Sequence, residues 1–129
     1  MCEVIHNGSL IVDDIEDSSD LRRNKPCVHK IYGVDIAINA GNFMCYVPMQ
    51  YIFKSNVYTS SQKLEFAKIY FEEMVQIHFG QGWDILWHNN NKIEGDYPTV
   101  EQYLQMTAHK TGVLPRLVAR LVGAFIGVP

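Results

Sequence analysis

The sequence predicts an all-α fold, and three observations favour it. From Phe66 to Ile77, apolar residues recur at the spacing of a helix that buries one face. Thr99 and Gln102, directly after Pro98, have the spacing of a capping box at the start of a helix. No two segments show the pattern of paired strands. We therefore expect helices over about residues 4–17, 34–53, 61–87, 99–109 and 113–127.

Local signals set the limits of these helices. The apolar run Val4–Val12 suits a buried helix or a buried strand. We favour a helix that continues to Asp17, because the Ser-Ser-Asp sequence at residues 18–20 then resembles a break. The His-Asn-Asn-Asn sequence at residues 88–91 predicts a loop, and Gly112 predicts a C-cap for the helix that precedes it.

The overall composition predicts one globular domain. The 129 residues are 47% hydrophobic and carry a net charge of −3. This mildly acidic balance, without a basic stripe, argues against a nucleic-acid partner. The sequence has no long uncharged apolar run and no signal-peptide pattern, so we expect no transmembrane segment. Cys2, Cys27 and Cys45 lack metal-binding spacing and predict free thiols in a reducing, cytoplasmic environment.

An acidic cluster lies at the end of the first expected helix. Asp13, Asp14 and Asp17 are three and four residues apart, so we expect their carboxylates to converge on one side of the helix. Like charges at this spacing repel, and carboxylates at a helix C-terminus oppose the helix dipole. A cation would offset both effects. Mg²⁺ is the natural candidate, because it binds through one or two carboxylates and shares substrate phosphates.

Basic residues follow the acidic cluster almost at once. Arg22, Arg23 and Lys25 are typical of phosphate recognition, which arginine performs with paired hydrogen bonds. A metal site followed by two arginines indicates binding of a diphosphate. The alternative interpretation of the acidic cluster is a solvated acidic turn. A calcium-binding EF-hand loop fits poorly, because its glycine and its final glutamate are missing.

The sequence resembles the trans-isoprenyl diphosphate synthases, and most closely the eukaryotic geranylgeranyl diphosphate synthases. Four stretches between His6 and Leu114 match in the family order: HNGSLIVDDIEDSSDLRRNKPCVHKIYG, INAGNF, GQGWDILW and PTVEQYLQMTAHKTGVL. The resemblance implies the central part of the helical bundle of the isoprenoid synthases. It also implies a Mg²⁺-dependent transfer of an allylic prenyl diphosphate to isopentenyl diphosphate, without a protein nucleophile.

The resemblance also implies roles for individual residues. Asp13 and Asp17 would bind Mg²⁺, with Asp14 in support and Asp84 near the metals. The residues that would bind the two diphosphates or face the active site are His6, Arg22, Arg23, Gln81 and Lys110. Thr111 would help to stabilise the allylic carbocation, and residues 8 and 9 (Gly8 and Ser9) would leave the pocket open for a geranylgeranyl-length product.

Each of these residues also has a simpler interpretation. His6 could be a buried histidine of the core, and Asp84 could be an ordinary carboxylate at a helix end. Lys110 could be a solvated lysine in a last turn. His29 is expected to be structural. The common register of the four motifs, rather than any one residue, favours the functional interpretation.

The match to the family pattern is incomplete. The family's second aspartate-rich motif and its earlier lysine and arginine elements have no counterpart between residues 1 and 129. We therefore expect a single partial synthase domain, inactive or nearly so by itself, from a protein that forms homodimers at full length. The alternative is a non-catalytic homologue or regulatory subunit that binds a full-length synthase. Pro115, just after the Lys110–Thr111 pair, makes the placement of Thr111 less certain.

Overall fold

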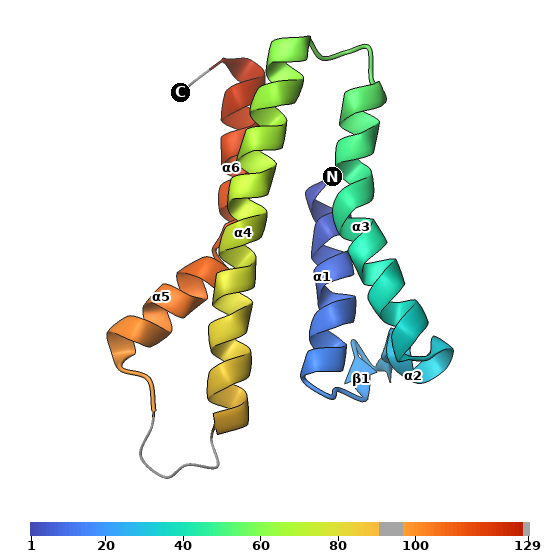
Figure 1. Cartoon of the computed structure of the whole chain (residues 1–129), viewed down its shortest axis with the longest axis vertical. Coiled ribbons are helices and arrows are strands. Elements are labelled where there is room, and N and C mark those ends of the chain that lie inside the picture. Colours follow the sequence, from blue (N-terminus) through green and yellow to red (C-terminus); the bar gives the residue numbers. More distant parts are fainter. Residues whose placement is uncertain (91–96, 128–129) are drawn as a thin grey trace. The chain divides into compact units, whose positions relative to one another are not determined.

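The computed structural model describes residues 1–90 and 97–127, which form helices and one short hairpin (Figure 1). The chain divides into two compact units, residues 1–58 and 59–129. The all-α prediction is confirmed for the described residues. Their elements are α1 (Cys2–Glu16), β1 (Leu21–Arg22), β2 (Lys25–Pro26), α2 (Val28–Tyr32), α3 (Val34–Lys54), α4 (Ser60–Asn90), α5 (Val100–Lys110) and α6 (Val113–Ile126).

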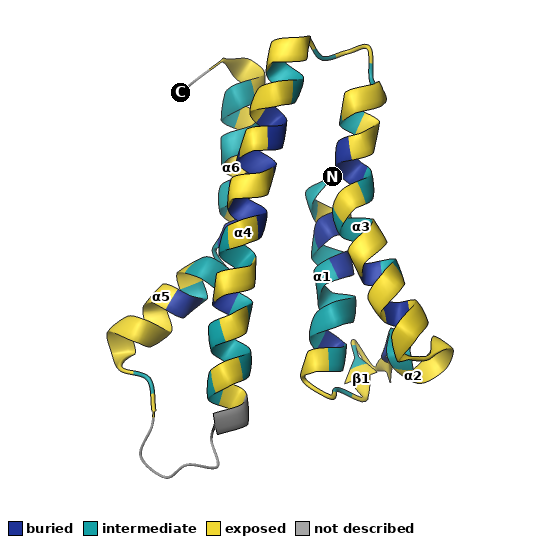
Figure 2. Ribbon diagram, in the orientation of Figure 1, coloured by how far each residue is buried: buried dark blue, intermediate teal, exposed yellow. Residues whose placement is uncertain are grey.

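The first unit is built on the packing of α1 along α3. Two glycines allow the two backbones to approach closely. A Cβ atom on Gly8 would lie 2.7 Å from the Cβ of Met44 and 2.8 Å from the carbonyl oxygen of Gly41. Ile5 of α1 and Ala37 of α3 are fully buried, and buried positions occur along both helices (Figure 2). A larger residue at position 8 would therefore push the two helices apart.

A tight hairpin follows α1, and the sequence did not predict it. Leu21 pairs with Pro26, and Arg22 pairs with Lys25, which leaves Arg23 and Asn24 as a two-residue loop. Both loop residues have positive φ angles, 52° and 61°, as a type I′ turn requires. The expectation of no strand pairing was therefore wrong. A glycine at the second loop position would have indicated such a turn, and here Asn24 takes its place.

The second unit is built on α4, which contacts both α5 and α6. The apolar spacing in α4 predicted its buried face, and Phe66, Tyr70 and Met74 are indeed buried. The predicted capping box is confirmed, because Thr99 accepts a hydrogen bond from the Gln102 backbone and the Gln102 side chain bonds back to the Thr99 backbone. Among the described residues, none of the helices combines the length and the apolar character needed to cross a bilayer.

Two boundary predictions need correction. Residues 88–90 belong to α4 rather than to a loop, and Asn91 lies outside the described residues. Gly112 is not a left-handed C-cap, because its φ is −72° and it precedes α6, while Thr111 caps α5. Position 112 requires glycine for its small size rather than for a left-handed conformation. A Cβ atom there would lie 2.7 Å from the carbonyl oxygen of Ala108.

Candidate functional site

The three aspartates of the acidic cluster lie in the last turn of α1, but they have different environments. Asp13 is half-buried, Asp14 is buried with 3% of its surface exposed, and Asp17 is exposed as the C-cap. The last turn of α1 has no basic residue, so the repulsion expected from the sequence is present within the helix.

Arg22 reaches back from the hairpin to neutralise Asp14. Its Nε and Nη2 atoms donate to Oδ1 of Asp14 at 2.9 and 2.5 Å, and Nη2 also lies 3.3 Å from Oδ2 of Asp13. The hydrogen bonds to Asp14 raise the pKa of the Arg22 guanidinium. The carboxylates of Asp13 and Asp14 thus meet at the same Arg22 nitrogen, and the convergence of all three carboxylates stays a prediction. Among residues 1–90 and 97–127, no group of three or more metal-binding side chains is present.

Cys27 completes the buried surroundings of Asp14. Burial raises the pKa of the Cys27 thiol, and a hydrogen bond to Asp14 adds to this shift. The backbone N–H of Cys27 donates to the carbonyl oxygen of Asp20 at 3.0 Å, so the chain after the hairpin is tied to the chain before it. All three cysteines are free thiols, as predicted. Sequence spacing gave no signal that Cys27 would contact Asp14.

The two adjacent arginines have different positions. Arg22 lies on β1 and is half-buried against Asp14, whereas Arg23 is exposed in the turn. A left-handed conformation costs a residue other than glycine about 1–2 kcal/mol. The turn geometry imposes this conformation and leaves the Arg23 side chain exposed. Arg23 can therefore contact a ligand while Arg22 is held by the protein.

Gly8 and Ser9 also have different surroundings, because they lie on different sides of α1. Successive residues of a helix are rotated by about 100°, so Ser9 lies within about 40° of Asp13, while Gly8 lies about 140° away. Gly8 is buried against α3. Ser9 is half-buried and donates its hydroxyl to the carbonyl oxygen of His6 at 2.9 Å. The half-buried His6 lies on the face of α1 that carries Asp13 and Ser9.

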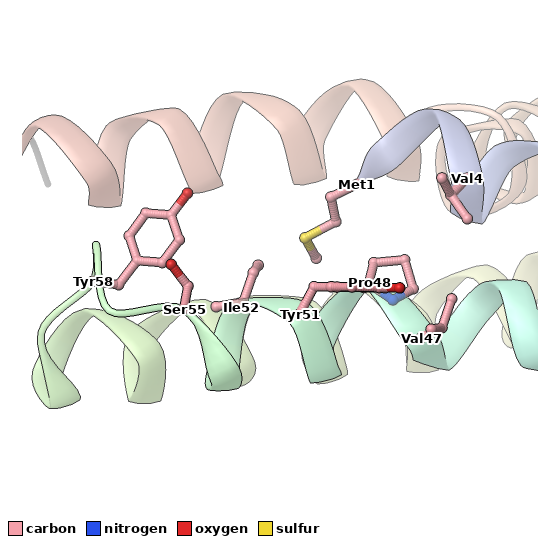
Figure 3. A pocket seen from close by; sticks show the side chains of 8 residues that line it. All are labelled: Met1, Val4, Val47, Pro48, Tyr51, Ile52, Ser55 and Tyr58. Carbon is pink, nitrogen blue, oxygen red and sulfur yellow. The ribbon is translucent and has the colours of Figure 1, made fainter.

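An apolar pocket of about 480 Å³ lies at the other end of α1, between this helix and α3 (Figure 3). Val4 lines it from α1, nine residues before Asp13 and therefore on the opposite face of the helix. The pocket does not continue the face that carries Asp13 and Ser9. Its lining residues are Met1, Val4, Val47, Pro48, Tyr51, Ile52, Ser55 and Tyr58.

The second unit carries the remaining predicted residues. The ammonium group of Lys110, in the last turn of α5, forms an ion pair with the carboxylate of Asp84 on α4. Asp84 thus lies inside α4 rather than at a helix end, and its partner is on α5. Lys110 is half-buried rather than fully solvated. Gln81 is half-buried, and Thr111 is exposed. The two sets of predicted residues lie in separate units, and each set is described within its own unit.

A buried ion cluster in the second unit was not predicted. Glu73 on α4 is 2% exposed and is bound by Arg116 and Arg120 of α6. Burial opposes ionisation of Glu73, but the hydrogen bonds from Arg116 and then Arg120 outweigh it and lower the pKa of the carboxyl group. The partners are 43 and 47 residues apart, so no local spacing could have revealed the cluster.

A profile of the polyprenyl synthetase family matches residues 1–129. The chain belongs to the polyprenyl synthetase family. Among the relatives, a geranylgeranyl pyrophosphate synthase of Clitopilus passeckerianus is 40% identical over 128 residues, which cover 98% of this chain and 35% of that protein. A geranylgeranyl pyrophosphate synthase of Dictyostelium discoideum is 40% identical over 124 residues, 94% of this chain and 37% of that protein. The chain thus spans about a third of the length of these relatives.

The acidic cluster of this polyprenyl synthetase chain suits one kind of divalent metal better than another. Asp13 and Asp17 are separated by one helical turn, and Asp17 is exposed. Asp14 is held by Arg22 in a buried position, Asp13 also pairs with Arg22 and has a side chain that is 18% exposed, and Asp17 is the most exposed of the three. Two carboxylates fit Mg²⁺, which completes its shell with waters and substrate phosphates, and do not fit an ion that needs an all-protein cage.

Proposed function

We propose that this chain is the central part of a prenyltransferase that condenses isopentenyl diphosphate with an allylic prenyl diphosphate. The observation that carries the proposal is the Asp13–Asp17 pair, one helical turn apart at the end of α1, where Arg22 binds the intervening Asp14 and also contacts Asp13. The names of the relatives support geranylgeranyl diphosphate as the product. On this proposal, residues 1–129 are one partial synthase domain whose activity belongs to the longer protein.

Asp13 and Asp17 would hold Mg²⁺, and the bound ion would stabilise the negative charge of the departing diphosphate. The chain's own cations would share this task. Arg23, exposed in the turn, would contact one diphosphate, and Arg22 would present the part of its guanidinium that Asp14 does not occupy. Asp84 is paired with Lys110, so it could approach a metal only when a diphosphate replaces it at the ammonium group.

The second unit would contribute Lys110 and its neighbours. Lys110 would bind a diphosphate oxygen, and electrostatic stabilisation by a positive charge already in place usually lowers the barrier of such a reaction more than any other effect. Gln81 and His6 would hold the second substrate through hydrogen bonds. The Thr111 hydroxyl would stabilise positive charge on the allylic carbon, where water must be excluded.

Product length would be set by Ser9 rather than by Gly8. Ser9 lies on the face of Asp13, so a large side chain there would obstruct a prenyl chain bound to the metals. In an active full-length context, we expect Ser9→Phe to shift the product toward farnesyl length. Gly8→Phe would instead disrupt the contact of α1 with α3 and is not a fair test.

A second candidate function is a non-catalytic subunit that binds a full-length synthase. The exposed apolar residues of α6, including Val118, Val122 and Phe125, favour it, because such residues are typical of interaction surfaces. Homodimer formation at full length and a cytoplasmic location are further parts of our proposal. They follow from the family resemblance and from the free thiols.

Calorimetric titration would test the catalytic proposal. The ligand is a farnesyl diphosphate analogue that cannot lose its diphosphate. We expect binding by the 129-residue chain only with Mg²⁺, and loss of at least tenfold in affinity in Asp13→Ala. Asp20→Asn is the matched control, because Asp20 is an exposed carboxylate that lies just beyond the cluster and pairs with Lys30. Metal-independent association with a full-length synthase and no analogue binding would favour the non-catalytic subunit.

A further inference from the structure

Three residues on one face of α4 contact the end of α5 or the helix that follows it. Glu73 binds Arg116 of α6, Gly80 contacts the backbone of Lys110, and Asp84 pairs with the Lys110 ammonium group. Their separations of seven and four residues are close to two turns and one turn of a helix. A single face of α4 therefore contacts both sides of the α5–α6 junction, where Lys110 lies.

Several hydrogen bonds to Glu73 restrict the position of α6. Nε of Arg116 lies 3.0 and 2.8 Å from the two carboxylate oxygens, and Nη2 lies 2.8 Å from Oε2. Arg120 adds a bond of 2.8 Å from Nη1 to Oε1. Arg116 is in the first turn of α6, so these bonds set the height and the rotation of α6 immediately after the junction.

The same arginine also reaches the other side of the junction. Nη1 of Arg116 lies 3.4 Å from the carbonyl oxygen of Ala108, in the last turn of α5. One guanidinium thus connects α4, α5 and α6. Residues 108 and 116 flank the junction, and Lys110 lies between them in the chain.

Gly80 fixes the distance between the junction and α4. A Cβ atom on Gly80 would lie 2.6 Å from the carbonyl carbon of His109 and closer still to the backbone nitrogen of Lys110. Backbone atoms cannot yield as a flexible side chain can. The start of the Lys110 side chain is therefore held directly against α4, one turn from Asp84.

Stability alone does not account for a buried charge at position 73. Removing a carboxylate from water costs several kcal/mol, and replacement of buried ion pairs by apolar residues is often neutral or stabilising. Apolar contacts are non-directional, whereas hydrogen bonds to a carboxylate depend on angle and distance. Glu73 therefore supplies a precision of placement that an apolar side chain would not supply.

We propose that Glu73 is a positioning residue for Lys110: through Arg116 it fixes the α5–α6 junction so that the Lys110 ammonium group meets Asp84. This placement is a property of the free protein. Its consequence for ligand binding, namely that Lys110 is held ready for a diphosphate, rests on the proposed function.

Competitive acetylation of the 129-residue chain with acetic anhydride tests this placement without any ligand. The exposed Lys68 of α4 is the internal reference. In the wild-type chain we expect Lys110 to react several-fold more slowly than Lys68, because it is paired and half-buried. In Glu73→Gln, Lys110 should react at nearly the rate of Lys68.

The neighbouring Glu72 provides a matched control. Glu72 is exposed and binds the outer side of Arg120, so Glu72→Gln should leave the reactivity of Lys110 unchanged. Equal rates for Lys110 in wild-type and Glu73→Gln chains of the same helicity would overturn the proposal. Equal rates for Lys110 and Lys68 in the wild-type chain would overturn it too.

A second variant separates placement from stability. Glu73→Met combined with Arg116→Leu should keep the second unit folded, since buried ion pairs can be replaced by apolar residues. We expect Lys110 to be released even in this stable variant. Full protection of Lys110 in it would assign Glu73 a packing role only and would contradict the proposal.

Titration with inorganic diphosphate and Mg²⁺ then tests the consequence for ligand binding. We expect about tenfold weaker binding in Glu73→Gln than in the Glu72→Gln control. If the wild-type chain binds no diphosphate, the proposed function fails, and the acetylation result still decides whether Glu73 positions Lys110. If diphosphate binds equally to both variants, the link from placement to binding is wrong.

Discussion

Two buried carboxylates, Asp14 and Glu73, are bound by arginine in different ways. Asp14 receives Arg22 from a hairpin eight residues away, whereas Glu73 receives Arg116 and Arg120 from a helix more than 40 residues away. Asp14 can therefore be satisfied as soon as α1 and the hairpin form. Glu73 is satisfied only when α6 has packed on α4.

This difference separates a local device from a global one. The Asp14–Arg22 pair shapes the end of one helix, beside the exposed Asp17. The Glu73 cluster holds together the helices of the second unit and, with them, the junction that carries Lys110. Loss of the first should alter ligand binding more than stability, and loss of the second should alter both.

The largest effect is expected for Glu73→Ala. The change removes a buried carboxylate that accepts hydrogen bonds from two arginines, and hydrogen bonds to a charged group are worth about 1.5–3 kcal/mol each, so we expect a loss of about 3–5 kcal/mol. Urea unfolding followed by tryptophan fluorescence would measure it, since Trp83 and Trp87 both lie in the second unit. Glu72→Ala, at an exposed pair, should cost about 1 kcal/mol or less. Equal losses for the two variants would remove the distinction between the buried and the exposed carboxylate.

A smaller effect is expected for Asp14→Asn. Hydrogen bonds to a charged group are worth about 1.5–3 kcal/mol, and the half-exposed Arg22 can turn to water when its partner is lost. Circular dichroism should show modest destabilisation of the first unit, and analogue titration should show weaker Mg²⁺-dependent binding. A loss as large as that of Glu73→Ala would mean that Asp14 also holds its unit together.

Next in size is the effect of Gly80→Ala. The added methyl group would meet the backbone at His109 and Lys110, and overpacking of this kind costs about 1–3 kcal/mol. Gly82→Ala is the matched control two residues away, where a Cβ atom would meet nothing within 4 Å. The control should gain up to about 1 kcal/mol from helix propensity. A stabilised Gly80→Ala variant would contradict the close contact of α4 with the junction.

The smallest effect is a dependence of stability on acidic pH. The folded pKa of Glu73 is lowered, so its contribution to stability is fully present above the ordinary value of about 4.3 and is lost as the pH falls through the folded pKa. The ionisation of Glu73 should leave the unfolding midpoint, measured by tryptophan fluorescence, unchanged between pH 7 and pH 5. Below pH 5 the midpoint should decrease. Glu73→Gln should show a shallower decline, and an unchanged decline would exclude Glu73 as its source.

The sequence predicted the limits of the helices better than the environments of individual residues. The helix limits near Thr99 and Asp17 depend on neighbouring residues, and the structure agrees with the prediction at both. The type I′ turn was missed because Asn24 stands where glycine is usual. Helical spacing placed Asp14 with Asp13 and Asp17, but spacing alone does not show that Arg22 draws Asp14 into the protein.

The second unit shows the same limit more strongly. The family resemblance identified Asp84 and Lys110, and the structure brings them together as an ion pair. Glu73 and Arg116 lie outside the matched roles, and 43 residues separate them. Only the packing of α6 on α4 reveals that they meet, and only the backbone contact at Gly80 shows why glycine precedes Gln81.

We propose that Asp13 and Asp17 bind the metal, whereas Asp14 holds Arg22 within the protein. Paramagnetic broadening by Mn²⁺, used in place of Mg²⁺ with inorganic diphosphate, tests it in the isotope-labelled chain. We expect backbone signals of residues 13–17 to broaden first, and the effect to vanish in a variant with Asp13→Ala and Asp17→Ala. Broadening centred on another exposed carboxylate, such as Glu101, or unchanged by the double substitution, would contradict the claim.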